Sequence, residues 1–256
     1  MGRHLSDQLE LLRPFRPGGR ESTWLAFNHA LHNEVAVRFL RSSATLVFRR
    51  ARELAEVESA NIVALHQVGQ TREGAPYLEM ELLEGLDLRE HLREGPLAMA
   101  DVATVVKHIG QALAVLHERG WVHGQLTPAS IFVSEFDDEP LVRLIDFGLD
   151  RPPRDASLYA PPELVIDGAE ASPATDRWGL AAIAFVALTG RPPFGHDVEQ
   201  LGVGMATGQI RWPASEALDP WFRTALARDP ASRPPTTAEL VDDFLRCTRE
   251  VGLSIV

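Results

Sequence analysis

Apolar and polar positions alternate with a period of two at residues 34–40 and 77–82, both in the first third of the chain. That period places successive side chains on opposite faces of a strand, so both segments are predicted β-strands. Residues 46–58, between them, are predicted to form one helix that ends before residues 59–61. The first third is therefore predicted to be a small, sheet-rich unit with one main helix.

A helical period replaces this alternation later in the chain. Between residues 99 and 119 the apolar positions follow the i, i+3, i+4, i+7 spacing of an amphipathic helix. Residues 178–188 are apolar nearly all round, which predicts a helix inside a core. A turn signal at Gly85 separates the last predicted strand from the helical part. We therefore expect a boundary near Leu83.

Composition and charge narrow the class of protein. The chain has 256 residues, of which 45% are hydrophobic and 24% charged, as expected for one folded globular domain or two lobes sharing an interface. A net charge of −11 disfavours a nucleic-acid partner and favours cationic or neutral proteins. Cys247 is the only cysteine, so a reducing cytoplasm is expected. The longest apolar run, residues 180–188, is too short to span a bilayer, and no membrane insertion is expected.

The segment from His123 to Ser130 reads His-Gly-Gln-Leu-Thr-Pro-Ala-Ser, and an Asp-Phe-Gly triplet begins at Asp146. Together they resemble the catalytic loop and the metal-binding motif of protein kinases, where the loop reads His-Arg-Asp-Leu-x-x-x-Asn. In that family the Asp accepts the substrate proton and the Asn holds a second magnesium. Gln125 and Ser130 occupy those two positions here, and Thr127 replaces the usual lysine between them. The resemblance therefore assigns no catalytic residue to this chain.

Further motifs extend the resemblance over essentially the whole chain, in the order found in bacterial Ser/Thr protein kinases. They include Val-Ala-Val-Arg at residues 35–38 and Tyr-Ala-Pro-Pro-Glu at residues 159–163. The resemblance implies an α+β fold in one kinase-like domain over residues 1–256. It has a small antiparallel-sheet N-lobe at about 1–82, a hinge at about 83–86 and a larger, mostly helical C-lobe at about 87–256. It also implies that Glu163 and Arg233 form a buried ion pair and that Asp176 anchors the catalytic-loop backbone.

The resemblance also implies an ATP site. Met80 takes the gatekeeper position, Glu81 and Leu83 the hinge, and Ala36 the ceiling over adenine. Phe132 lies at the floor, where it either supports adenine or fills the pocket. The full set of cofactor-binding positions is Gly18, Gly19, Ala36, Arg38, Met80, Glu81, Leu83, Phe132 and Asp146.

The phosphate end of this site departs from the family pattern. Gly18, followed by Gly19, keeps the middle position of the glycine-rich loop, while both outer glycines are replaced; a simple turn is the alternative interpretation. Arg38 replaces the phosphate-binding lysine, and its glutamate partner's position falls on Arg50, so the activating ion pair cannot form. Two alternatives stay open: Glu53 pairs with either arginine in a shifted register, or Arg38 is a surface cation.

Asp146 is the one catalytic-type carboxylate that remains, and alone it holds Mg²⁺ weakly or serves only to fix its loop. Activation-loop phosphorylation is not expected, because Gly124 replaces the arginine that reads the phosphate and Ser157 is the only hydroxyl in residues 149–158. The cofactor expected is thus ATP with weak or no Mg²⁺, or none.

These substitutions predict a pseudokinase: a cytoplasmic kinase-like domain, impaired in catalysis, that acts as a signalling scaffold or allosteric regulator. Its expected partner is a protein, an active kinase or another signalling component. The first alternative is a divergent, low-activity Ser/Thr protein kinase or another ATP-dependent transferase, since phosphoryl transfer depends mainly on positioning and charge. The second is a nucleotide sensor that binds ATP without turnover.

Overall fold

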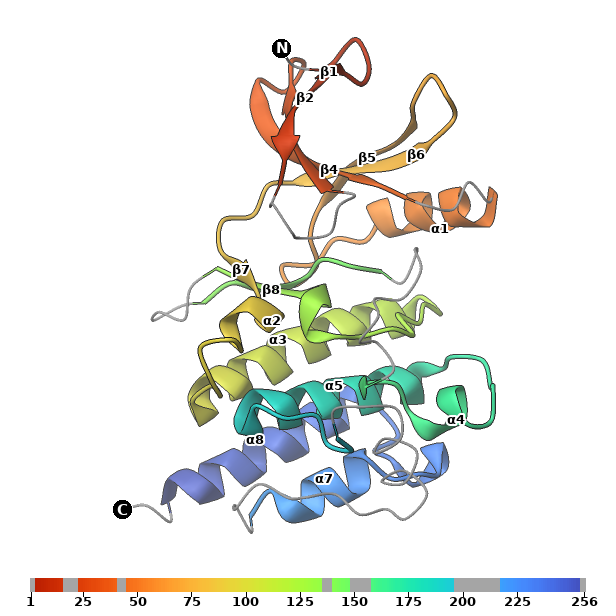
Figure 1. Cartoon of the computed structure of the whole chain (residues 1–256). Helices are drawn as coiled ribbons and strands as arrows, with labels where there is room; N and C mark the ends of the chain where they lie inside the picture. Colours follow the sequence, from red (N-terminus) through yellow and green to blue (C-terminus); the bar gives the residue numbers. More distant parts are fainter. Residues whose placement is uncertain are drawn as a thin grey trace. The chain divides into compact units, whose positions relative to one another are not determined.

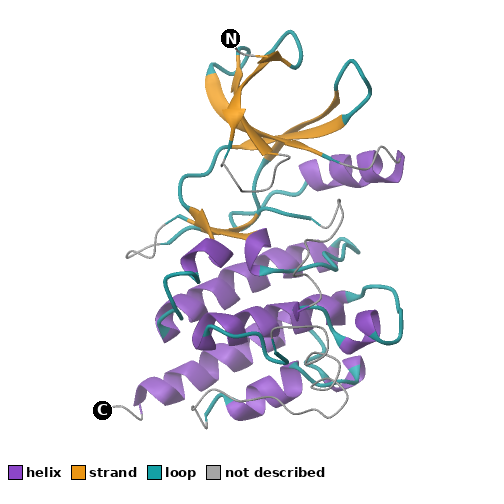
Figure 2. Cartoon of the chain, in the orientation of Figure 1, coloured by secondary structure: helices purple, strands orange, loops and turns teal. Residues whose placement is uncertain are grey.

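The computed structural model describes residues 3–15, 23–40, 45–134, 140–147, 158–195 and 217–253. These residues fall into two compact units, and the chain passes from the first to the second between Glu84 and Gly85 (Figure 1). Strands dominate the first unit and helices the second (Figure 2). The predicted protein-kinase fold, with an antiparallel-sheet lobe and a helical lobe, is confirmed.

The first unit is built on a six-stranded sheet in the order β1-β2-β3-β4-β6-β5, with every neighbouring pair antiparallel. Its strands are β1 (Arg3–His4), β2 (Leu9–Pro14), β3 (Thr23–Asn28), β4 (Asn33–Phe39), β5 (Leu65–Gln70) and β6 (Pro76–Glu81). The strands predicted at residues 34–40 and 77–82 are β4 and β6, so both predictions are confirmed.

Both faces of this sheet carry buried side chains. One face holds a core cluster of Leu9, Leu11, Ala26, Val35, Val37 and Tyr77. The ring of Tyr77 lies over Gly69 of β5, where an added Cβ atom would come within 2.3 Å of the ring. Helix α1 (Thr45–Ala55) contacts β5 and buries Ala51 and Leu54. The predicted helix is confirmed, although it ends at Ala55, before its expected end.

The second unit is mostly helical. Its helices are α2 (Leu88–His91), α3 (Met99–Glu118), α4 (Pro162–Val165), α5 (Pro173–Thr189), α7 (Asp219–Ala225) and α8 (Thr237–Leu253), with short 3₁₀ helices η1 (Pro128–Ser130) and η3 (Pro230–Ser232). A three-stranded antiparallel sheet, in the order β7-β8-β9, adds β7 (Leu86–Asp87), β8 (Ile131–Val133) and β9 (Val142–Leu144).

Helix α5 forms the centre of this unit. Every residue from Ala174 to Ala187 is buried. This confirms the core helix predicted at residues 178–188, of which only Leu188 is half-buried. Helix α3 contacts both α5 and α8 through its apolar stripe, which confirms the amphipathic helix predicted at residues 99–119. By length and composition alone α3 is long and apolar enough to cross a membrane. Its packing against α5 and α8 accounts for that apolar character.

A buried ion pair joins α4 to the segment before α8. The Arg233 guanidinium donates to both carboxylate oxygens of Glu163 at 2.7 Å and to the carbonyl of Ala174 at 3.0 Å. Its central carbon also lies 4.7 Å from the centre of the Trp178 ring. Because Glu163 and Arg233 are only 8% and 3% exposed, each charge depends on the other for compensation. The implied ion pair is confirmed.

We expect Glu163→Ala to lower the free energy of unfolding by roughly 3–5 kcal/mol, because it leaves the Arg233 guanidinium buried without its counter-charge. The matched control is Asp219→Ala, which removes the ion pair between Asp219 and Arg223, whose side chains are 29% and 61% exposed; its loss should cost at most about 1 kcal/mol. Urea denaturation of both variants measures the difference. Equal losses would contradict the role given to burial.

Candidate functional site

The loop that resembles a kinase catalytic loop is fixed by Asp176 of α5. Oδ2 of this carboxylate accepts a hydrogen bond from the backbone N–H of His123 at 2.8 Å, and Oδ1 accepts one from that of Gly124 at 2.7 Å. The Nε2 atom of His117, on α3, lies 2.9 Å from Oδ2, and its Nδ1 atom lies 3.1 Å from the hydroxyl of Thr237 on α8. The expectation that Asp176 anchors this loop is confirmed.

Sequence reasoning missed His117 and Thr237 as parts of this anchor. His117 follows Leu113 by four positions and therefore lies along the apolar stripe of α3, whose other members are buried. A polar residue in such a stripe needs a hydrogen-bond partner. That requirement was the available signal, but the sequence did not say that the partner was Asp176.

Gly124 has a backbone conformation that explains its identity. Its φ is +74°, in the left-handed region that disfavours residues with a Cβ atom. An added Cβ would also lie 3.0 Å from the Cβ of Ala171. An arginine, which the family has here, would face both the backbone strain and this close contact.

Gly124→Ala and Gly120→Ala form a matched pair that separates these two effects. Gly120 has a φ of +73° but no atom within 4 Å of a built Cβ, so its variant should lose about 1–2 kcal/mol of stability through backbone strain alone. Gly124→Ala should lose more stability, and the double variant Gly124→Ala/Ala171→Gly should recover the excess. Thermal unfolding of the three variants measures this, and equal losses for the two alanine variants would contradict it.

Thr127 and Ser130, two of the substituted catalytic-loop residues, are hydrogen-bonded to each other. Thr127 and Ser130 are both fully buried, and their hydroxyl oxygens lie 3.1 Å apart. The Ser130 hydroxyl also accepts from the backbone N–H of Thr127 at 3.3 Å, while the Ser130 N–H donates to the Thr127 carbonyl at 2.9 Å. Both side chains thus cap η1. The third position, Gln125, is half-buried, and its N–H donates to Nδ1 of His123 at 3.3 Å.

Asp146 is held from both sides within the second unit. Its backbone carbonyl bonds to Nε2 of His123, and its Oδ1 accepts from the N–H of Phe147 at 2.9 Å. The residue is 7% exposed. Within the described part of the chain, no three His, Cys, Asp or Glu side chains gather to hold a metal. Asp146 combined with the buried Ser130 hydroxyl does not fit the two-magnesium site of the kinase family.

The predicted adenine-side residues of the first unit share one face of its sheet. Ala36 on β4 lies directly opposite Met80 on β6, and Arg38 lies opposite Leu78. Ala36, Met80 and Arg38 are only 7%, 6% and 7% exposed. The alternative that Arg38 is a surface cation is therefore wrong.

The position of Glu53 on helix α1 tests the alternative in which it pairs with Arg38 or Arg50. Oε1 of Glu53 lies 3.8 Å from Nε of Arg49, one turn away, and these side chains are 50% and 70% exposed. Arg50 is half-buried. Glu53 therefore belongs to the solvent-facing side of α1, and its predicted pairing with Arg38 or Arg50 is wrong.

The remaining predicted site residues are divided between the two units. At the end of β6, the N–H of Glu81 donates to the Ala64 carbonyl at 3.0 Å, and its carboxylate accepts from the Ala64 N–H at 2.7 Å. Leu83 follows, half-buried. Phe132, on β8 of the second unit, is 5% exposed; whether it supports adenine or fills the pocket stays a prediction. Gly18, Gly19 and residues 148–157 lie outside the described residues.

Burial changes the pKa of a residue beside the anchor. It lowers the pKa of Arg177, the neighbour of Asp176 on α5, and Arg233 lowers it further, while the carboxylates of Asp176 and Glu239 oppose the shift. An arginine still keeps its charge at neutral pH. The Arg177 guanidinium is thus a desolvated cation within the helical core.

Comparisons with known proteins decide the family. The model of the protein kinase domain family matches residues 22–250. The chain belongs to the protein kinase family. Serine/threonine-protein kinase PknB of Mycobacterium leprae is 31% identical over 275 residues, which cover 95% of this chain and 43% of that protein. Serine/threonine-protein kinase pkn2 of Myxococcus xanthus is 25% identical over 268 residues, covering 93% of this chain and 32% of that protein.

This kinase domain therefore spans less than half the length of the curated relatives that it matches. A solved structure, the kinase domain of Mycobacterium tuberculosis PknI in a double-mutant form, matches with a TM-score of 0.74. It is 22% identical, and the match covers 94% of this chain and 96% of that one. At that identity the likeness bears on the fold alone.

Proposed function

We propose that this kinase-fold domain is a pseudokinase, which binds a protein partner as a scaffold or allosteric regulator and does not transfer phosphate efficiently. The observation that carries the proposal is the catalytic loop. Its backbone is anchored as in a working kinase fold, while Gln125 holds the base position and the Ser130 hydroxyl is bonded to Thr127. The loop keeps its structure without the groups that perform the reaction.

The cost of these substitutions follows from their chemistry. The Gln125 amide cannot accept the substrate proton, and loss of a positioned base slows such reactions by roughly 10²- to 10⁴-fold. Ser130 and Thr127 offer neither a carboxamide ligand for magnesium nor a cation beside the phosphate. Because the substitutions remove the proton acceptor, a magnesium ligand and the cation beside the phosphate together, we expect little phosphate transfer.

Asp146 supports the second candidate, a low-activity Ser/Thr kinase, another ATP-dependent transferase, or a sensor that binds ATP without turnover. Its buried carboxylate stands at the family's magnesium position. The facing pair of Ala36 and Met80 is also compatible with an adenine site. This candidate requires that nucleotide bind and that its affinity depend on Asp146.

The partner we propose is a protein, either an active kinase or another signalling component in the cytoplasm. The net charge of −11 favours a neutral or basic protein surface over nucleic acid. The named relatives are Ser/Thr protein kinases, and this similarity supports the proposal that the partner takes part in phosphorylation signalling. Regulation through binding needs the fold but no turnover.

Gln125→Asp is the variant that separates a rebuilt loop from a dormant enzyme. We expect it to give no gain in ³²P transfer from ATP to a basic acceptor protein, because Ser130, Thr127 and Arg38 remain substituted. Gln125→Asn is the control, since it shortens the side chain as Asp does without adding charge. A gain of about 100-fold or more in Gln125→Asp alone would support the low-activity kinase and contradict the pseudokinase.

Thermal unfolding with millimolar ATP tests the nucleotide-dependent candidates. A ligand at about 100 times its dissociation constant stabilises a protein by about 2.7 kcal/mol, a shift of several degrees. We expect magnesium to add nothing to any shift that ATP produces, because the described residues do not complete a metal site. A magnesium-dependent shift that Asp146→Ala abolishes would support the sensor or weak enzyme instead.

A further inference from the structure

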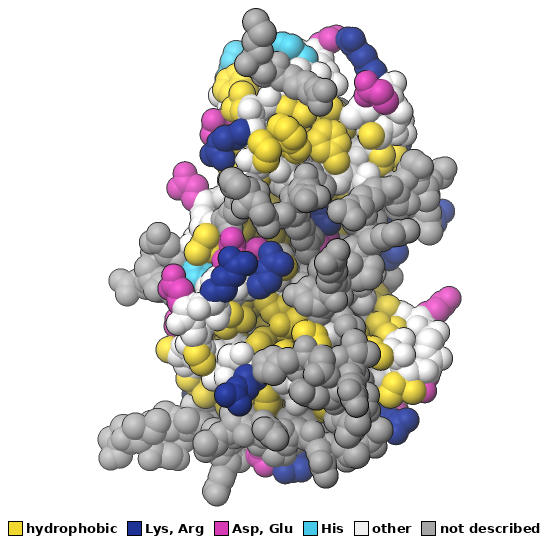
Figure 3. Space-filling view, viewed as in Figure 1, with side chains coloured by type: hydrophobic (Ala, Val, Ile, Leu, Met, Phe, Trp, Pro, Cys, Tyr) yellow, Lys and Arg dark blue, Asp and Glu magenta, His cyan; other side chains and the backbone are white. Residues whose placement is uncertain are grey.

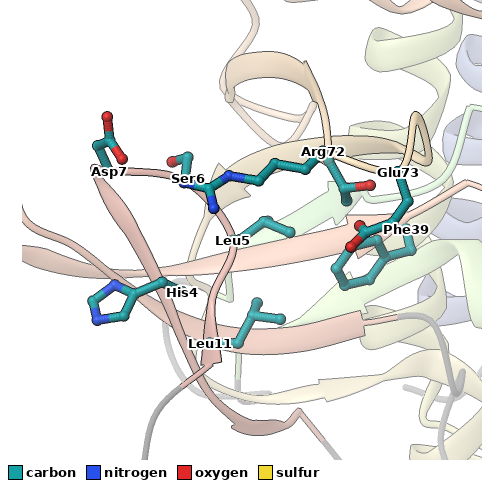
Figure 4. Close-up of a pocket in the computed structure, with 9 residues that line it drawn as sticks. His4, Leu5, Ser6, Asp7, Leu11, Phe39, Arg72 and Glu73 are labelled. Carbon is teal, nitrogen blue, oxygen red and sulfur yellow. The ribbon is translucent and has the colours of Figure 1, made fainter.

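The first unit contains a pocket that the kinase resemblance does not assign. It has a volume of about 800 Å³ and opens between the β1–β2 turn, the end of β4 and the β5–β6 turn (Figure 4). Leu5, Leu11 and Phe39 form its apolar floor. The polar groups around it belong to His4, Ser6, Asp7, Thr71, Arg72 and Glu73. This volume lies within the range of ligand sites. Apolar side chains also reach the surface over the strands of this unit (Figure 3).

Hydrogen bonds within both turns hold the pocket in shape. In the first turn the N–H of Leu5 donates to the Leu9 carbonyl at 2.9 Å, and the Ser6 hydroxyl accepts from the N–H of Leu9 at 3.2 Å. In the second, the N–H of Thr71 donates to the Ala75 carbonyl at 2.8 Å, and the Thr71 hydroxyl accepts from the Ala75 N–H at 3.1 Å. A site held this way requires little ordering when a ligand binds.

The pocket floor packs against the ring of Tyr77 and carries no charge. The Phe39 ring packs edge-on against Tyr77, with ring centres 6.4 Å apart. Burial raises the pKa of Tyr77, and the nearby Glu79 carboxylate raises it further, although a hydrogen bond with Ser6 opposes both. The phenol is therefore neutral throughout the physiological range. An apolar side chain of a ligand would lie on Phe39 and the two leucines without displacing a charge.

Three charged side chains line the pocket: the carboxylates of Asp7 and Glu73 and the guanidinium of Arg72. Arg72 and Glu73, from the β5–β6 turn, extend in different directions. The Arg72 guanidinium extends toward Ser6, whereas the Glu73 carboxylate extends toward Phe39 (Figure 4). Both side chains are exposed, and among the described residues neither takes part in an ion pair. A ligand that is apolar in the middle, with an anion toward Arg72 and a cation toward Glu73, complements the floor and these two side chains; Asp7 adds a second carboxylate to the rim.

We propose that this pocket binds a segment of a partner protein in which an aromatic or bulky aliphatic residue lies between an acidic and a basic residue. The apolar residue packs on Leu5, Leu11 and Phe39, the acid pairs with Arg72 and the base with Glu73. The proposal rests on the proposed function in one respect, that the ligand is a protein. It gives that binding function a surface in the first unit.

The test uses acetylated and amidated tripeptides as probes of the whole chain. Chemical-shift titration compares Glu-Phe-Lys with Lys-Phe-Glu, and Glu-Ala-Lys is the control that removes the aromatic ring. We expect one charge order to bind more tightly than the other, and the alanine control to bind at least about tenfold more weakly because the buried ring is lost. The affected resonances should include those of Leu5, Phe39 and Arg72.

The double variant Arg72→Glu/Glu73→Arg is the sharpest comparison, because it keeps the net charge and both residues lie on an exposed turn. It should reverse the preferred charge order. Three results would overturn the proposal: no saturable shift at about 10 mM peptide, the same charge order in both proteins, or a concentration-dependent dimer that Arg72→Glu abolishes, which would assign the pocket to a second copy. None of them bears on phosphate transfer, so the pseudokinase proposal fails or survives separately.

Discussion

One buried carboxylate organises the part of the protein where a kinase performs its reaction. Asp176 receives the N–H groups of His123 and Gly124, and its contact with His117 extends to Thr237 on α8. A carboxylate that is 1% exposed is costly unless such partners surround it. The loop conformation, the left-handed Gly124 and the contact between His123 and Asp146 all follow from this anchor. None of them requires a reactive side chain.

This independence explains how the kinase fold persists while residues of its catalytic loop are substituted. Asp176 and the ion pair of Glu163 with Arg233 are buried within the helical unit, so their loss would cost stability. Gln125, Thr127 and Ser130 stand where the family places groups that meet the proton, the phosphate and the metal. Their replacement leaves the anchors untouched. The two hydroxyls even add a cap to η1.

Much of the fold was predictable from the sequence, because strand and helix periods are local properties. Strands β4 and β6 and helices α3 and α5 followed from spacing alone, and the family motifs gave the ion pair of Glu163 with Arg233. What the sequence could not predict was which residue each side chain contacts. The bond between Thr127 and Ser130, the burial of Arg38 and the pairing of Glu53 with Arg49 depend on packing in three dimensions, which a residue pattern does not encode. For the same reason, the sequence did not predict the positive φ of Gly124.

Transfer of the ³²P-labelled γ-phosphate of ATP by the wild-type chain is the direct test of whether this domain catalyses phosphoryl transfer. The measurement follows labelled protein, both self-labelled and acceptor, with millimolar magnesium and with Asp146→Ala as the blank. A pseudokinase should label protein no faster than the Asp146→Ala blank does. Robust labelling that Asp146→Ala abolishes would show that the loop still catalyses phosphoryl transfer and that the domain is not a pseudokinase.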